Sequence, residues 1–162
     1  MPNEWLVMGT GEFLNPEETL SETTLERYNQ AGNSDETVTI ADFDELSDAT
    51  IQNGLESLTW EFSSTQIRDV AFSATLESRW DATRTPVGDL DGDGETDYSR
   101  INTFFREAAP LWSEQAEYAQ HSISFLSDYT NLPYPWPHMT SVEGAGIIGG
   151  GMEFPMMTVI GD

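Results

Sequence analysis

Two apolar periodicities, one after the other along the chain, constrain the fold of this sequence most strongly. Apolar residues alternate with polar ones from Leu58 to Phe62, and the same two-residue period runs from Val70 to Trp80. This alternation is typical of antiparallel strands with one face on a core. A helical spacing follows after Pro110 and predicts a helix from about 111 to 129. The apolar stripe of this helix comprises Trp112, Ala116, Ala119, Ile123 and Leu126.

Shorter signals predict the remaining elements and the fold class. Three prolines at 133–137 end the long helix. We therefore expect an α+β protein, with a mostly-β portion over residues 1–108 and a second portion, beginning with the helix, over 109–162. The other predicted elements are strands at 5–10, 36–40 and 156–162, a helix capped by Ser21 and stopped at Gly32, and a helical turn within 41–54.

Charge is the dominant feature of the composition. Six Arg and no Lys face 29 Asp and Glu residues, giving a formal net charge of -23. Binding to nucleic acid or to an anionic membrane surface is disfavoured, because both need clustered cations. Two interpretations stay open. The acidic surface either is simply solvated and suited to high salt, or it attracts cationic ligands such as peptide amino termini.

The missing residue types exclude several kinds of site. The chain has no cysteine, which excludes disulfides, cysteine-bound zinc and thiol catalysis. His121 and His138 are the only histidines and do not form an H-E-x-x-H pattern. No stretch approaches the roughly 20 apolar residues of a membrane helix, and residues 1–12 do not resemble a signal peptide. For the compartment we nevertheless expect an exported protein, periplasmic or extracellular.

An acidic loop at 89–97, "DLDGDGETD", resembles a calcium-binding loop. Its aspartates alternate as in an EF-hand cradle, and Gly94 occupies the position of the sharp turn. The pattern fails at its last ligand, where Arg100 stands in place of glutamate. The alternative is a solvated hairpin tip in which Asp and Gly supply turn chemistry. The candidate calcium ligands are Asp89, Asp91, Asp93 and Asp97.

The stretch "GAGIIGGGMEFPMMTVIGD" at the carboxyl end carries the strongest functional signal. Glycines allow backbone to approach a ligand closely, and an edge strand can pair with an extended peptide. Glu153 lies in the middle of this stretch and can hold a free ammonium through a charge-assisted hydrogen bond. The alternative is a glycine-rich turn before an edge strand, with Glu153 in solvent.

This stretch resembles a known family. "GGMEFP" at 150–155 is similar to the G-x-M-E-N exopeptidase motif of the aminopeptidase N family of zinc metallopeptidases, the gluzincins. The preceding "YPWP" at 134–137 is similar to that family's Y-P-[YFW]-P loop, which follows a helix. The resemblance covers roughly residues 105–162. The fold it implies is the end of a mostly-β N-terminal domain followed by the start of a thermolysin-like catalytic domain.

The resemblance also implies roles for individual residues. Glu153 matches the glutamate that binds the α-amino group of a peptide, so the expected partner is a peptide with a free N-terminus. Gly150, Gly151 and Met152 match the backbone segment that pairs with the substrate. Phe154 stands where the family most often has asparagine.

The resemblance further implies a zinc cofactor whose ligands lie downstream of Asp162. The catalytic base lies there too, so this chain is expected to be inactive by itself. Two alternatives stay open. One is a noncatalytic acidic module that binds calcium or a cationic peptide, and the other is a pseudoenzyme that has lost its zinc ligands.

Overall fold

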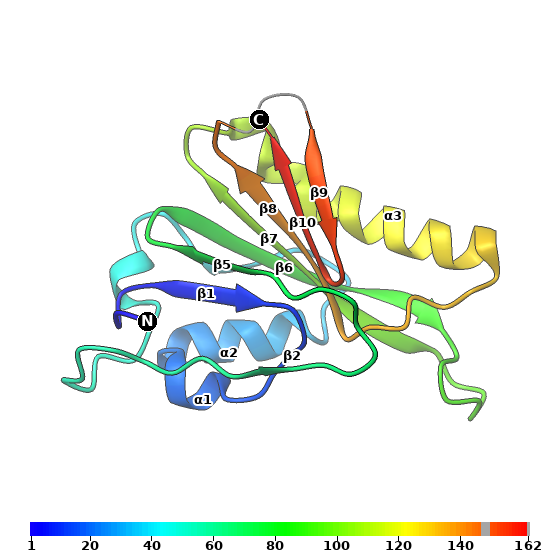
Figure 1. Ribbon diagram of the computed structural model, residues 1–162, viewed down its shortest axis with the longest axis horizontal. Helices are drawn as coiled ribbons and strands as arrows, with labels where there is room; N and C mark the ends of the chain where they lie inside the picture. The colour runs from blue at the N-terminus through cyan, green and yellow to red at the C-terminus, as the bar shows by residue number, and fades with distance from the viewer. Residues whose placement is uncertain (147–149, 162) are drawn as a thin grey trace.

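A six-stranded mixed sheet forms the centre of the computed structural model, which describes residues 1–146 and 150–161 (Figure 1). The strand order is β3-β6-β7-β8-β10-β9. β8 is parallel to both of its neighbours, and the other pairs are antiparallel. The strands are β3 (Val38–Ala41), β6 (Ser78–Gly88), β7 (Asp97–Arg106), β8 (His138–Gly144), β9 (Gly151–Phe154) and β10 (Met157–Gly161).

The sheet continues across the boundary expected between residues 108 and 109. β7 lies before this boundary and pairs in parallel with β8, from Arg100 opposite His138 to Phe104 opposite Val142. A parallel pair needs a crossover. This crossover consists of the 3-10 helix η2 (Pro110–Glu114) and the helix α3 (Gln115–Thr130). The protein is thus of mixed α and β structure with more strand than helix, as the sequence predicts at the level of class.

The two faces of the sheet are covered differently (Figure 1). α3 packs on one face, mainly against β6. The other face carries two short ribbons and two short helices. Their side chains meet the sheet in one apolar core, in which Trp80 stacks on Phe104 and both contact the cluster that contains Leu6 and Met8. The ribbons are β1 (Leu6–Gly9) with β5 (Phe72–Thr75) and β2 (Glu12–Phe13) with β4 (Phe62–Ser63), and the helices are α1 (Pro16–Thr19) and α2 (Glu22–Ala31).

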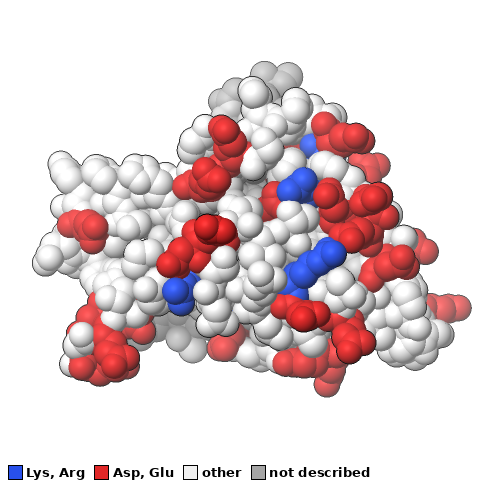
Figure 2. Space-filling view, turned by 180° about the vertical axis from the view of Figure 1, so that it is seen from behind, with Lys and Arg blue, Asp and Glu red and all other residues white. Residues whose placement is uncertain are grey.

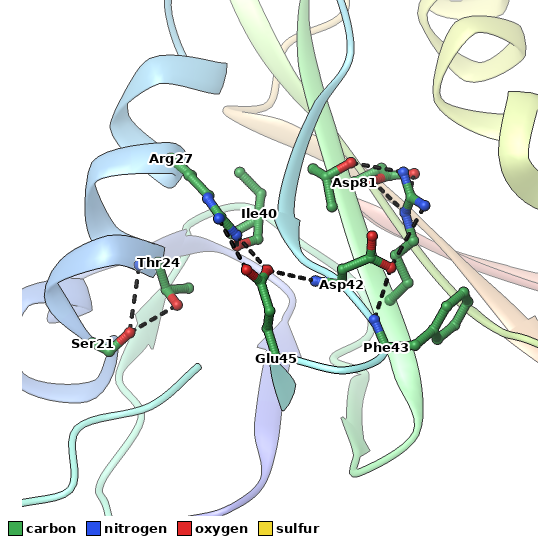
Figure 3. A network of polar contacts seen from close by, with 10 residues as sticks. Ser21, Thr24, Arg27, Ile40, Asp42, Phe43, Glu45 and Asp81 are labelled. Carbon is green, nitrogen blue, oxygen red and sulfur yellow. Dashed lines mark hydrogen bonds and ion pairs between the residues drawn. The ribbon is translucent and has the colours of Figure 1, made fainter. Parts of the chain in front are cut away.

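The first half of the chain confirms several local predictions. α2 begins after Ser21, whose hydroxyl accepts a hydrogen bond from the Thr24 amide, and it ends at Gly32. A helical turn, η1 (Leu46–Asp48), forms within 41–54. Arg27 of α2 pairs with Glu45 just before this turn, and Figure 3 shows how this pair ties the helix to the turn. The strands predicted at 5–10 and 36–40 are β1 and β3.

The strand predicted at 58–62 is largely wrong. Only Phe62 and Ser63 pair with another strand. The Asn15 side chain instead bonds the backbone of this segment, accepting from the Glu61 amide and donating to the Thr59 carbonyl. This side chain satisfies backbone groups that a strand partner would otherwise satisfy.

The strand character predicted over 70–80 is confirmed in two separate strands, β5 and the start of β6, because the chain turns between them. The Thr75 hydroxyl accepts from the amides of Glu77 and Ser78 and so stabilises this turn. Before this turn Val70 and Phe72 are 76% and 72% exposed, whereas Trp80 beyond it is fully buried.

The helix predicted at 111–129 is confirmed as η2 followed by α3. Its stripe is buried at Trp112, Ala116 and Ala119, but Leu126 is 52% exposed. The C-terminal half of α3 therefore presents apolar side chains to solvent.

Among the described residues, none of the helices has both the length and the hydrophobicity that a membrane span requires.

Candidate functional site

The candidate site is β9 at the edge of the central sheet (Figure 1). β9 pairs with β10 through an antiparallel register that sets Glu153 opposite Thr158. The turn between the two strands is anchored because the Thr10 hydroxyl donates to the Pro155 carbonyl at 3.2 Å. Within residues 1–146 and 150–161, no strand pairs with the other edge of β9. The backbone of this outer edge is therefore available to an extended ligand.

The alternation of β9 separates its side chains onto two faces. Thr158, opposite Glu153, lines a hollow beside α3, so Glu153 lies on the α3 face. Phe154 lies on the other face and packs against the main core. Packing thus explains an apolar residue at 154.

Glu153 stands at one end of a row of polar side chains that crosses the sheet on its α3 face. Thr158 of β10 follows, and Ser141 of β8 lies opposite Thr158. The Gln115 amide of α3 donates to the Ser141 hydroxyl at 3.3 Å. Next to this row lies the hollow of about 360 Å³, whose wall also includes Ile160. The row can orient a polar backbone, and the hollow can accommodate an apolar side chain.

The Glu153 carboxylate is exposed and forms no ion pair with any described residue. The Glu153 charge does act on one cation, the guanidinium of Arg68. The hydrogen bond from Arg68 to Asp69 raises the pKa of the Arg68 guanidinium, and the Glu153 charge adds to this rise. Glu153 is therefore free to accept hydrogen bonds from an incoming ammonium group.

The two glycines before Met152 differ in how much space surrounds them. A Cβ added at Gly151 would lie 2.8 Å from the Val159 carbonyl oxygen, whereas a Cβ added at Gly150 would meet nothing within 4 Å. We expect Gly151→Ala to lower the free energy of unfolding by about 1–3 kcal/mol, because backbone of β10 must move. Gly150→Ala is the matched control and is expected to leave stability nearly unchanged. Urea denaturation of both variants checks this difference, and equal stabilities would contradict it.

The acidic loop forms the tip of the β6–β7 hairpin. Asp89, Asp91 and Asp97 each offer a carboxylate oxygen within 4.8 Å of the others, so the structure brings three of the four predicted ligands together. Asp93 is not in this group, and its carboxylate accepts from the Glu95 amide at 2.8 Å. Asp89 likewise accepts from the amides of Gly92 and Gly94. These carboxylates thus accept hydrogen bonds from backbone amides of the loop and stabilise its turn. Calcium binding stays a prediction.

Calorimetric titration with calcium tests this prediction. If the loop binds calcium, wild-type protein releases or absorbs heat on titration and melts at a lower temperature after chelation. Asp89→Asn should weaken binding by about tenfold or more, since it removes one anionic ligand. Asp128→Asn on α3, outside the loop, is the matched control. A titration without heat, together with a melting temperature that chelation leaves unchanged, would remove the idea.

The histidines do not form a zinc site. His138 is 5% exposed, and burial lowers its pKa to about 4. Both of its ring nitrogens are occupied, Nε2 at 2.9 Å from the Gly11 carbonyl and Nδ1 at 3.0 Å from the Thr140 hydroxyl. His121 is exposed on α3. Among described residues, the aspartate trio is the single group of three or more metal-ligating side chains close enough to share an ion.

Figure 2 shows carboxylates spread over much of the face seen from behind. Five of the six arginines are already paired with carboxylates. The part of this face formed by α3 carries little charge, because its sequence has only Glu117 and Asp128 as charged residues. A positively charged ligand is therefore attracted to much of this face rather than to one patch.

Sequence reasoning missed the ion pair that stabilises the sheet near the site. Glu143 of β8 has a fully buried side chain and accepts several hydrogen bonds from Arg106 at the end of β7. The two residues are 37 positions apart, and no local pattern joins them.

No family model matches this chain, and no curated protein shows significant similarity to it.

Proposed function

We propose that this chain is part of a zinc-dependent aminopeptidase and that β9 binds the amino-terminal residue of its peptide substrate. The observation that carries the proposal is the position of Glu153 on a strand whose outer edge pairs with no described strand. The motif "GGMEFP" thus occurs on an element that can pair with a peptide. The acidic surface supports the proposal as well, since it attracts a cationic peptide end.

Binding on this proposal uses backbone and side chain together. An extended peptide adds to the outer edge of β9, where backbone hydrogen bonds fix its direction. Gly150 and Gly151 have no side chain, so the peptide can approach their backbone closely. Glu153 accepts hydrogen bonds from the peptide's ammonium group, which sets the register at the first residue. An amino-blocked peptide lacks that charge and fits poorly.

Residues 1–146 and 150–161 do not supply the zinc site that the proposal requires, since His138 is occupied and His121 lies apart on α3. On the proposal, zinc is held by residues outside this chain. The role assigned to the chain is to bind and orient the amino terminus. In the same way, residues 1–108 are proposed as the end of an N-terminal domain and 109–162 as the start of a thermolysin-like catalytic domain.

Metal removal from the complete protein tests this function. The complete protein should cleave the first peptide bond of an unblocked peptide, and a zinc chelator should abolish the activity. Added zinc should restore it, because the reaction needs the metal. The isolated 162-residue chain is the matched control and should be inactive. A complete protein without zinc or peptidase activity would refute the proposal and favour the noncatalytic acidic module or the pseudoenzyme.

A further inference from the structure

Arg100 differs from the other arginines because no carboxylate of the described residues pairs with it. Every other arginine lies within 4.0 Å of an aspartate or glutamate. Arg100 is partly buried, and no described carboxylate pairs with it. A largely desolvated cation without a counterion is costly. In a chain with 29 acidic residues the exception needs an explanation.

The protein holds the Arg100 guanidinium in place without neutralising it. The guanidinium lies 3.8 Å from the centre of the Tyr28 ring, and Nη1 donates to the Tyr28 carbonyl near the C-terminus of α2. Both contacts favour a cation there. A Cβ at Gly32 would lie 2.5 Å from Nη2. Gly32 has an ordinary φ of -66°, which any residue can adopt. Glycine is therefore required at this position to leave space for Arg100 and not for its backbone freedom.

A cavity of about 190 Å³ opens beside Arg100. Two of its other polar side chains, Asn102 and His138, are already engaged. Asn102 accepts from the Trp80 indole and donates to the Thr140 hydroxyl, and both ring nitrogens of His138 are bonded. A guanidinium has five N–H donors, and the described part of the chain accepts from one of those of Arg100. Arg100 is therefore the cationic side chain in this cavity, and it keeps donors that no described group uses.

We propose that this cavity binds a small carboxylate through Arg100. The planar fork of a guanidinium matches the two oxygens of a carboxylate. Met8 and Phe13 also line the cavity and can contact a short apolar tail. Glu12 lines the same cavity and repels a second negative charge, so the site suits monocarboxylates better than dicarboxylates. A neighbouring hollow of about 410 Å³ shares Glu12 and Pro137 with the cavity, which leaves room for a longer ligand.

Nuclear magnetic resonance of the arginine Nε–H groups tests the proposal on the 162-residue chain. The six arginines give six such signals, and the Arg100→Lys spectrum identifies that of Arg100. Propionate is titrated at constant ionic strength against sodium sulfate. The Arg100 signal should shift and saturate, whereas that of Arg84, paired with Asp35 at the surface, should not. An Arg100 signal that stays in place, or that shifts linearly together with the other five, would overturn the proposal.

Variants and related ligands sharpen the result. Gly32→Ala keeps an allowed backbone but displaces the guanidinium, so it should weaken propionate binding by about tenfold or more. Succinate should bind less well than propionate because of Glu12. Tighter binding of N-acetylalanine than of propionate would identify a peptide carboxyl end as the ligand, and the reverse order a free small acid. Unchanged affinity in a folded Gly32→Ala variant would contradict the role of Arg100.

Discussion

Glu153→Ala in the complete protein is expected to lower kcat/KM for an unblocked peptide by about a hundredfold or more. On the proposed function, this variant loses the carboxylate that accepts hydrogen bonds from the substrate ammonium. Steady-state kinetics on a short peptide with a free amino terminus measure the effect. The fold should be retained, because Glu153 is exposed and forms no ion pair with a described residue.

Two further variants separate charge from structure. Glu153→Gln keeps a hydrogen-bond acceptor but removes the charge, so its kcat/KM should fall between those of wild type and Glu153→Ala. Glu117→Ala removes an exposed carboxylate from α3 and should leave kcat/KM nearly unchanged. If Glu153→Ala cleaved the peptide as well as wild type does, Glu153 would have no part in substrate binding.

Glu143→Ala is expected to lower the free energy of unfolding by about 3 kcal/mol. The Glu143 side chain is fully buried and accepts from the Arg106 backbone amide at 2.9 Å as well as from the Arg106 guanidinium. Its removal leaves a cation and an amide without these bonds. Because the Arg106 side chain is 30% exposed, water compensates in part, which places the effect at the low end for buried pairs. Urea denaturation near neutral pH measures it.

The pH dependence of stability gives an independent check. Hydrogen bonds from Arg106 hold the pKa of Glu143 below its ordinary value. The stabilisation is therefore complete above the ordinary carboxyl pKa and is lost as the pH falls toward the lowered one. Glu143→Gln cannot titrate, so its difference from wild type should shrink in acid. A difference that stays constant from neutral pH into acid would show that the charge of Glu143 does not stabilise the fold.

Local signals made part of the fold predictable. The α2 helix has a serine cap at Ser21 and a glycine stop at Gly32, and both act within a few residues. The part of the apolar stripe that precedes Leu126 likewise predicted the position of α3. An apolar pattern with helical spacing over several turns is compatible with few structures other than a helix. The strand predicted at 156–162 is confirmed over Met157–Gly161 as β10, and Asp162 lies outside the described residues. The aspartate alternation at 89–97 placed three carboxylates together because the loop is short.

Contacts between distant parts of the chain were not predictable. The apolar alternation at 58–62 does not reveal that Asn15 satisfies its backbone instead of a strand. Val70 and Phe72 obey the same alternation as Trp80, yet they lie in solvent. For the site, the glycine stretch indicated an edge strand. That Glu153 shares a sheet face with α3 followed only from the register with Thr158.

The most direct test of whether Glu153 on β9 binds a substrate ammonium is a comparison of two substrates. It measures kcat/KM for one peptide with a free amino terminus and for the N-acetylated form of that peptide, and it takes the ratio of the two values. The complete protein is the enzyme for both measurements. We predict a ratio of about a hundred or more for wild type, falling toward one in Glu153→Ala. Equal cleavage of the free and the acetylated peptide by the wild-type protein would contradict the proposed role of this strand.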